Sequence, residues 1–192
     1  RIKEVCKTFK VNTIYHTAAY KHVPMVEENP FEAVINNIQG TKSCAEAAME
    51  SKVDTFVFIS TDKAVRPTNI MGATKRFSEL FLQSIASKDM TRMSMVRFGN
   101  VLGSSGSVIN KFNEEIENEN FVTVTHPEVT RFFMTVEESV NLILNASLMA
   151  KGGEIFLLDM GKPIKIIDIA KKMISLRGLE LFDKTTNKGD IE

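Results

Sequence analysis

The sequence predicts an α/β fold in which a parallel sheet carries helices on both faces. Short apolar, β-branched runs alternate along the chain with longer stretches of helical periodicity, which is the pattern of βαβ units. Residues 55–60 (TFVFIS) form a continuous apolar run, as expected for a strand buried on both sides of a parallel sheet. The 192 residues contain no internal repeat or linker, so we expect one domain with a small additional lobe.

The predicted strands are short and follow one another at helix-length intervals. We expect strands at residues 12–19, 55–60, 93–98, 121–125 and 154–159. Ligands of open parallel sheets bind beyond the carboxyl ends of the strands. The loops to inspect for function therefore follow Ala19, Ser60, Phe98 and Asp159.

Helical periodicity fills the intervals between these strands. Asn29, Pro30 and Glu32 are typical of a helix start with Asn29 as its cap, and Gly178 is typical of a glycine that ends a helix. The predicted helices cover residues 31–51, 71–87, 108–119, 136–150 and 164–177. In the first two, the apolar residues expected to face the core are Phe31, Val34, Ile35, Ile38, Ala45, Ala48, Met49, Phe77, Leu80, Phe81 and Ile85.

Composition argues against several classes of protein. Lys and Arg together number 24, as do Asp and Glu, so the net charge is zero and a nucleic-acid partner is not expected. No apolar run approaches the roughly 18 residues of a membrane-spanning helix, and no signal peptide opens the chain. Cys6 and Cys44 lie far apart without a CxxC motif, which favours free thiols in a reducing compartment and no metal site.

The loop richest in reactive side chains is residues 60–63 (STDK), directly after the predicted buried strand. It places hydroxyls, a carboxylate and an ammonium side by side at a strand end. On the following helix, Met71 and Lys75 share one face at i, i+4 spacing. The alternative interpretation is a solvated ion pair between Asp62 and Lys63, with Lys75 as an ordinary surface lysine.

Residues 59–76 (ISTDKAVRPTNIMGATKR) resemble the extended short-chain dehydrogenase/reductase superfamily, and more narrowly the polysaccharide-biosynthesis proteins that act as UDP-N-acetylglucosamine 4,6-dehydratases. Most superfamily members carry Tyr-x-x-x-Lys. Here Met71 replaces the tyrosine and Lys75 is the matching lysine, a variant typical of the larger, membrane-anchored dehydratases. The resemblance covers almost the whole chain through residues 16–27 (HTAAYKHVPMVE), 36–41 (NNIQGT), 97–108 (RFGNVLGSSGSV) and 123–135 (TVTHPEVTRFFMT).

The resemblance implies a Rossmann-like sheet whose N-terminal βαβ portion lies outside this sequence. No GxGxxG phosphate loop is present, and residues 99–106 (GNVLGSSG) have a different spacing, so we expect the chain to begin partway through the sheet. Residues 1–100 are then a partial NAD-binding domain with the catalytic loop. Residues 101–192 are expected to form a small, mainly substrate-binding portion interleaved with the last elements of the sheet.

The family reaction implies roles for the loop. The sugar C4 hydroxyl is oxidised with NAD or NADP, the C4 ketone acidifies the C5 proton, water leaves across C5 and C6, and hydride returns to C6. The resemblance makes Asp62 the acid and Lys63 the base, and a lysine acts as a base near neutrality only when burial or cations lower its pKa from about 10. A thioether accepts no proton, so Thr61 or a water takes the C4 hydroxyl proton, assisted by Lys75. Met71 then packs against the substrate or nicotinamide, or simply in the core.

The resemblance also implies binding residues. Arg131 is favoured for the nucleotide diphosphate because a guanidinium presents a forked donor to phosphate oxygens, whereas the alternative is an ion pair with Glu128 or Glu137. His22 and Glu27 are weaker candidates for sugar contacts. The other expected substrate-binding residues are Asn100, Ser107, Val108, Thr123 and Val124, and the expected cofactor-binding residues are Ala18, Ala19, Lys21, Asn37, Ser60, Lys75, Phe98 and Asn100.

The expected partners are a UDP-sugar substrate and further copies of the chain, because the superfamily pairs helices into dimers. The expected location is the cytoplasm, with the parent protein anchored to the cytoplasmic face of the inner membrane, and the Met variant favours retention at C5. Two alternatives stay open. A nucleotide-sugar 4-epimerase would require the active-site tyrosine and no Asp-Lys pair, and a non-catalytic nucleotide-sugar-binding fragment or partner-binding scaffold would require neither.

Overall fold

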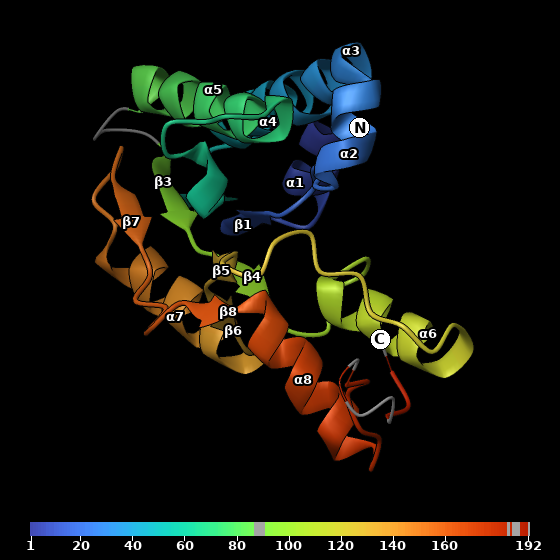
Figure 1. Cartoon of the computed structure of the whole chain (residues 1–192). Helices are drawn as coiled ribbons and strands as arrows, with labels where there is room; N and C mark the ends of the chain where they lie inside the picture. Colours follow the sequence, from blue (N-terminus) through green and yellow to red (C-terminus); the bar gives the residue numbers. More distant parts are fainter. Residues whose placement is uncertain (87–90, 184, 186–188, 192) are drawn as a thin grey trace. The chain divides into compact units, whose positions relative to one another are not determined.

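The computed structural model describes residues 1–86, 91–183, 185 and 189–191. These residues form two compact units. Unit 1 comprises Arg1–Phe98 and Glu138–Asp159, and unit 2 comprises Gly99–Glu137 and Met160–Glu192. Unit 1 contains a four-stranded sheet, whereas unit 2 contains two small two-stranded sheets (Figure 1).

The sheet of unit 1 is parallel throughout, as predicted. Its strands are β1 (Thr13–His16), β2 (Thr55–Ile59), β3 (Arg92–Arg97) and β7 (Ile155–Leu157), in the order β1-β2-β3-β7. The register places Phe56 opposite Ile14 on one side and Met93 on the other. The continuous apolar run therefore forms an interior strand.

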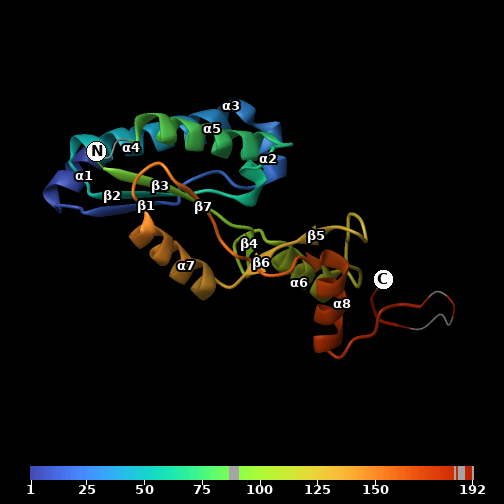
Figure 2. The same cartoon turned by 90° about the vertical axis from the view of Figure 1, so that its left-hand side faces the viewer.

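Helices cover both faces of this sheet, which confirms the predicted fold class. Helices α4 (Gly40–Glu50) and α5 (Ile70–Ile85) lie on one face and α7 (Val136–Met149) lies on the other (Figure 2). The Tyr15 hydroxyl, on β1, lies 3.2 Å from the Ser147 hydroxyl on α7. Two short helices were not predicted: α1 (Ile2–Thr8) and α2 (Val23–Glu28).

The predicted helix at residues 31–51 is helical throughout but not uniform. It consists of α3 (Pro30–Ala33), the π-helix η1 (Val34–Gln39) and α4. The expected cap is wrong in detail, because the Asn29 side chain donates back to the Met25 carbonyl instead of accepting from the first turn of α3. By contrast, Asn69 does cap α5 by accepting from the Gly72 amide at 2.8 Å. The predicted end of that helix at residue 87 lies outside the described residues.

Several apolar residues expected in the core face solvent instead. Phe31 is 83% exposed and Phe77 is 56% exposed, and Val34, Ile35 and Leu80 are also exposed. Periodicity shows that a helix has an apolar stripe, but it does not show which neighbour that stripe meets. The buried residues of α5 instead include Met71, Lys75, Ser78 and Leu82.

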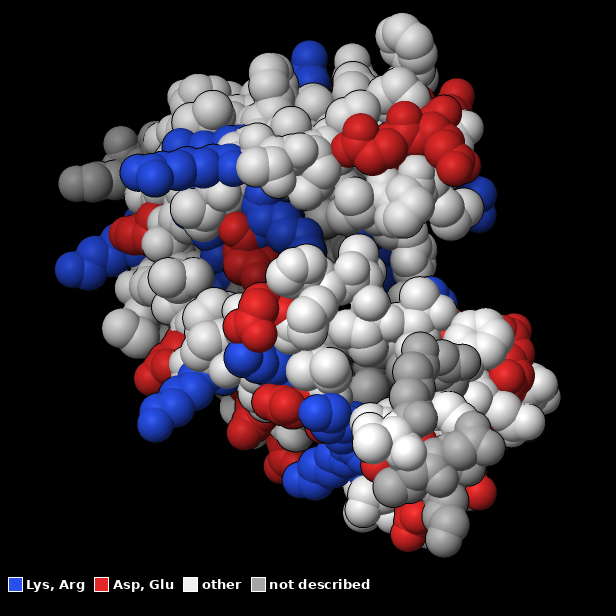
Figure 3. Space-filling view, viewed as in Figure 1, with Lys and Arg blue, Asp and Glu red and all other residues white. Residues whose placement is uncertain are grey.

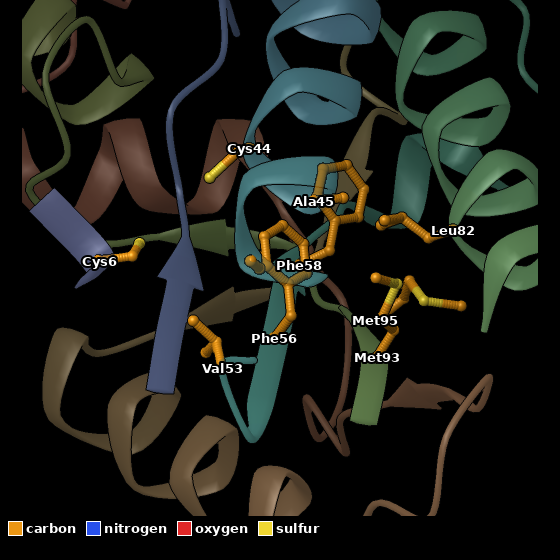
Figure 4. Close-up of a cluster of buried hydrophobic side chains, with 10 residues drawn as sticks. Cys6, Cys44, Ala45, Val53, Phe56, Phe58, Leu82, Met93 and Met95 are labelled. Carbon is orange, nitrogen blue, oxygen red and sulfur yellow. The ribbon is translucent and has the colours of Figure 1, made fainter. Parts of the chain in front are cut away.

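The main core of unit 1 packs the sheet against α4 and α5. Phe56 and Phe58 project from β2 into this cluster beside Leu82, Met93 and Met95 (Figure 4). Each of these side chains is at most 1% exposed. Burial of one phenylalanine contributes about 1.5–3 kcal/mol relative to exposure, so β2 is anchored strongly.

Unit 2 is built around two helices that pack together. Helices α6 (Val108–Asn118) and α8 (Ile166–Leu176) meet through Phe112, Ile166 and Ala170. Its small strands are β4 (Asn100–Val101) with β6 (Phe133–Met134), and β5 (Thr130–Arg131) with β8 (Ile164–Lys165). Gly178 follows α8 with a φ of 72°, as predicted.

Two predicted elements of unit 2 were wrong. Residues 121–125 form no strand; the Thr123 amide donates instead to the Glu115 carboxylate at 3.0 Å. The predicted helix at residues 164–177 begins only at Ile166, because the two residues before it pair as β8. Strands of two residues are too short to produce a readable alternation.

The surface carries charges of both signs. On the face shown in Figure 3, basic and acidic side chains are interspersed, as the zero net charge leads one to expect. Among the described residues, none of the helices has the length and apolar character that crossing a membrane would require.

Candidate active site

The catalytic loop predicted from the sequence lies at the carboxyl end of β2 and is tied to β3. The Ser60 amide donates to the Val96 carbonyl at 2.8 Å, and the Asp62 amide donates to the Phe98 carbonyl at 3.0 Å. A short 3-10 turn, η2 (Asp62–Ala64), follows. These two backbone hydrogen bonds continue the β2–β3 pairing beyond Ile59. They thereby fix the backbone positions of Asp62 and Lys63.

The side chains of this loop form one hydrogen-bonded group. Lys63 Nζ lies 3.1 Å from Asp62 Oδ1, and the Thr61 hydroxyl donates to the same oxygen at 3.0 Å. The Lys63 and Asp62 side chains are 28% and 25% exposed. The ion pair of the alternative interpretation is thus present, but it is largely sheltered rather than fully solvated.

A glycine that the sequence analysis did not single out brings α5 against this loop. A Cβ placed on Gly72 would lie only 2.3 Å from the Lys63 carbonyl oxygen. Any other side chain at position 72 would therefore push the helix and the loop apart. The Gly72 amide also donates to the capping Asn69 side-chain oxygen, so one residue fixes both the start of α5 and its distance from Lys63.

Lys75 is buried rather than on the surface. Its side chain is 6% exposed, and its ammonium lies 4.0 Å from the centre of the Phe58 ring. Burial lowers the pKa of Lys75 to about 8, although the nearby Glu79 carboxylate acts in the opposite direction. An ammonium with this pKa still carries its charge at neutral pH, and it does so inside the protein.

Glu79, one turn further along α5, is also buried and was missed by the sequence analysis. Arg97 donates to it through two nitrogens, at 2.7 and 2.5 Å, the Ser60 hydroxyl donates at 2.6 Å and Arg76 donates at 3.1 Å. Burial alone would raise the pKa of Glu79, but the hydrogen bonds from Arg97, Ser60 and Arg76 outweigh it and keep the pKa below its ordinary value. This Glu79 cluster joins the ends of β2 and β3 to α5.

Asn37, predicted to contact the cofactor, is 1% exposed and holds the loop after β1. Its side chain accepts from the Tyr20 amide at 2.7 Å and donates to the Tyr20 carbonyl and to the Thr74 hydroxyl, each at 3.0 Å. The loop containing Ala18, Ala19 and Lys21 is thereby linked to α5. The side chain's own oxygen and nitrogen are used within the chain.

Other predicted side chains of unit 1 also have partners in the chain. Met71 is 5% exposed and packs in an apolar cluster with Val26 and Ala33. Glu27 accepts from the Ile70 amide at 2.7 Å, and His22 precedes the first turn of α2. The position of Met71 fits core packing, which was one of the two interpretations of this residue.

The predicted substrate-binding residues belong to unit 2. Arg131 is exposed; its Nη1 donates to the Thr130 carbonyl, and Glu128 pairs with Lys165 instead. Ser107 precedes α6, and within the described chain its buried hydroxyl has no hydrogen-bond partner. Gly99 approaches Phe132 and Met160 of its own unit, where a Cβ would clash. The remaining predicted residues here are Asn100 on β4, Val108 at the start of α6, and Thr123 and Val124 in the segment after it.

Comparison with known proteins relates this chain to curated relatives and solved structures. It is 57% identical over 180 residues to the capsular polysaccharide biosynthesis protein CapD of Staphylococcus aureus, covering 93% of this chain and 30% of CapD. It is 39% identical over 164 residues to a UDP-N-acetylglucosamine 4,6-dehydratase (inverting) of Campylobacter jejuni, covering 83% of this chain and 49% of that protein. The chain is also 40% identical over 149 residues to a UDP-glucose 4-epimerase of Rickettsia canadensis, covering 76% of this chain and 44% of that protein.

A solved structure agrees with the fold. The X-ray structure of Pen from Bacillus thuringiensis matches with a TM-score of 0.86 and 40% identity, covering 92% of this chain and 54% of that one. The chain thus spans between about a third and a half of the length of these proteins. A family model described as "Polysaccharide biosynthesis protein" matches residues 1–191. This chain therefore belongs to the polysaccharide biosynthesis protein family.

Proposed function

We propose that this chain is the catalytic part of an NAD-dependent 4,6-dehydratase that converts a UDP-N-acetylhexosamine, first of all UDP-N-acetylglucosamine, to a 4-keto-6-deoxy sugar for surface polysaccharide. The observation that carries the proposal is the 3.1 Å contact between a carboxylate, Asp62, and an ammonium, Lys63, at the carboxyl end of a parallel strand. Membership of the family and the similarity to a named dehydratase support the same reaction.

The loop contains what an elimination of water requires. Moving one proton from Lys63 Nζ to Asp62 Oδ1 turns the ion pair into a neutral amine and a carboxylic acid. Lys63 then takes the C5 proton of the 4-keto sugar while Asp62 gives its proton to the departing C6 hydroxyl, and the ion pair is restored. Lys63 afterwards returns a proton to C5. Thr61, bonded to Asp62, passes the earlier C4 hydroxyl proton towards solvent.

The residues present fit a dinucleotide, NAD or, as the alternative, NADP. Lys75 is a buried ammonium that, among the described residues, has no hydrogen-bond acceptor, so it can donate to ribose hydroxyls. Ala18 and Ala19 keep the loop after β1 small enough for close approach. When bound, the cofactor would supply a hydride acceptor for C4 and a hydride donor for C6. The further contacts proposed within unit 1 are Lys21, Asn37, Ser60 and Phe98.

Unit 2 is proposed to bind the UDP portion of the substrate. Arg131 is exposed and forms no ion pair with any described residue, so its guanidinium remains available to a diphosphate. The Ser107 hydroxyl, just before α6, has no hydrogen-bond partner among the residues that the structure describes. The other proposed contacts in unit 2 are Asn100, Val108, Thr123 and Val124.

We also propose that the protein is a homo-oligomer that works in the cytoplasm. The exposed apolar side chains of α3, η1 and α5, among them Phe31, Ile35 and Phe77, offer a surface on which a second copy could bury them. Both cysteines are buried and unpaired, which suits a reducing compartment. A membrane anchor elsewhere in the parent protein is compatible with this arrangement.

The second candidate is a 4-epimerase, because proteins with that name match at similar identity. Position 71 argues against it, since a buried methionine replaces the tyrosine whose phenol would exchange the C4 hydroxyl proton. An epimerase leaves the C6 hydroxyl in place. The acid and base roles proposed for Asp62 and Lys63 would therefore have no use in that reaction.

The test incubates the complete protein that contains this sequence with UDP-N-acetylglucosamine and NAD, and follows the sugar by mass spectrometry. We expect loss of the mass of one water, reduced at least 100-fold in Lys63→Ala and in Asp62→Asn. Unchanged mass with exchange between gluco and galacto forms would replace the dehydratase by the epimerase. NMR of the product would separately decide between retention and inversion at C5. Inversion is the outcome in the name of the Campylobacter relative.

A further inference from the structure

We propose that Phe58 is a positioning residue for Lys75: the face of its ring, rather than a carboxylate, holds the lysine ammonium in place. The inference rests on the role of Lys75 in the proposed dehydratase. It deepens that role because it names the group that fixes the position of the Lys75 ammonium and favours its protonated form.

The geometry singles out Phe58 among the neighbours of Lys75. The ammonium lies 4.0 Å from the ring centre, within the range of a cation–π contact. Phe58 is 0% exposed and Lys75 is 6% exposed, so little water competes with the ring. Among the described residues, none forms an ion pair or a hydrogen bond with Lys75.

Two titratable groups and one aromatic ring lie near Lys75. The titratable groups are His16, on β1, and Glu79, one turn away on α5 itself, and the ring is that of Phe58 on β2. Glu79 is already engaged by Arg97, Arg76 and Ser60, so its oxygens are not free to hold Lys75. The ring is the remaining electron-rich partner.

His16, on the adjacent strand β1, stacks on the Phe58 ring. The two ring centres are 5.9 Å apart and the rings are stacked at 26°. His16 Nε2 lies 3.0 Å from the Thr41 hydroxyl, which itself donates to the Asn37 carbonyl at 2.7 Å. Because the Thr41 proton is used there, Nε2 must carry the proton that joins the two side chains.

This arrangement also keeps a second cation away from Lys75. Burial, and then the charge of Lys75, lower the pKa of His16 to about 4, so His16 is neutral in the range where the enzyme would work. A neutral imidazole can stack on Phe58 without repelling the ammonium. The π-helical residue Asn37 supplies the carbonyl that completes the chain of contacts.

Phe56 provides a matched control. It lies two residues earlier on β2, enters the same core cluster (Figure 4), is 0% exposed and also touches His16, with ring centres 5.7 Å apart. It has no contact with the Lys75 ammonium among the described residues. Phe56→Leu and Phe58→Leu therefore remove the same volume from one core, but only the second removes the ring under the charge.

The experiment measures the pH dependence of Lys75 acetylation by limiting acetic anhydride, read on the Lys75 peptide by mass spectrometry. The complete protein is compared with Phe58→Leu and Phe56→Leu. Loss of the ring destabilises the charged form, so the midpoint for Lys75 should fall by about one pH unit in Phe58→Leu and stay in place in Phe56→Leu. In turnover assays, Phe58→Leu should lower kcat more than it changes KM for the UDP-sugar.

A fluorinated phenylalanine at position 58 keeps the shape of the ring but weakens its negative face, so it decides the matter if Phe58→Leu does not fold. An unshifted midpoint in a folded Phe58 variant, or equal shifts in both leucine variants, would overturn the proposal. The labelling needs no turnover. A shifted midpoint in a protein that performs no dehydration would therefore refute the proposed function while supporting the role of Phe58.

Discussion

Lys75 and Glu79 lie one turn apart on the same face of α5, both buried, yet their surroundings are opposite. Glu79 accepts hydrogen bonds from three side chains, whereas the Lys75 ammonium faces an aromatic ring and, among the described residues, no acceptor. A satisfied buried charge fixes structure, because removing its partners leaves an uncompensated ion. A buried charge left without acceptors costs stability and is therefore available to a ligand. The difference separates the structural part of the candidate site from the part that we propose to be reactive.

The largest effect should come from breaking the Glu79 cluster. Glu79→Ala would leave Arg97, whose side chain is only 15% exposed, without its carboxylate, and should lower the free energy of unfolding by about 3–5 kcal/mol. Urea unfolding measures this change. The control is Arg76→Ala, which removes a 36% exposed partner of the same carboxylate and should cost less than about 1 kcal/mol. Equal losses in the two variants would show that the cluster does not hold the strand ends.

The opposite sign is expected for Lys75→Met. The pKa of Lys75 is about 8 in the folded protein, against an ordinary value of 10.5, so at pH 7 folding with a charged Lys75 costs up to roughly 3 kcal/mol. The variant should be more stable than the unchanged protein at pH 7 by up to that amount, while dehydration is lost. Because the unfolded chain binds more protons between pH 8 and 10.5, the unchanged protein gains stability across that range and the difference should shrink.

Denaturant unfolding of Lys75→Met and of the unchanged protein at pH 7 and pH 9.5 measures this difference in stability and its decrease with pH. Lys42→Met serves as a control, since Lys42 is about half exposed in a surface pair with Glu46. A loss of stability at pH 7 in Lys75→Met, larger than that of the control, would mean that Lys75 is held by partners other than those described.

A smaller effect on stability, but a clear one on catalysis, is expected from Gly72→Ala. The new methyl group would clash with the Lys63 carbonyl, and the loop must shift to relieve it. We expect a loss of about 1–3 kcal/mol in stability and at least about tenfold in kcat, because small misplacements of catalytic groups are costly. Gly40→Ala is the control, since a Cβ there meets nothing within 4 Å. A variant with unchanged kcat would show that loop position is not critical.

Much of the sheet could be predicted from the sequence because β2 reads as a continuous apolar run. The loop after it could be located for the same reason, and the structure brings Thr61, Asp62 and Lys63 together there. The orientation of α5 could not be predicted. Phe77 and Leu80 form an apolar stripe that faces solvent, while Ser78 and Glu79 are buried, so the usual assignment of apolar residues to the core was misleading.

The Glu79 cluster was missed for the same reason. A glutamate within a helix usually lies on the surface, and its partners Ser60 and Arg97 are distant in sequence. The π-helix also escaped prediction, because the change from α to π spacing leaves the sequence pattern helical throughout. Capping was predicted unevenly, since Asn69 caps its helix and Asn29 does not. The short strands of unit 2 depend on pairing between distant residues and have no local pattern.

The central claim is that the loop after β2 removes the C5 proton and the C6 hydroxyl of a UDP-sugar. The most direct measurement is mass spectrometry and NMR of UDP-N-acetylglucosamine after incubation of the complete protein with NAD in deuterated water. The account predicts loss of one water and gain of one solvent deuterium at C5, both abolished by Lys63→Ala, because Lys63 exchanges its proton with solvent before returning it. A sugar that keeps its C6 hydroxyl and gains no deuterium, with or without inversion at C4, would contradict the account.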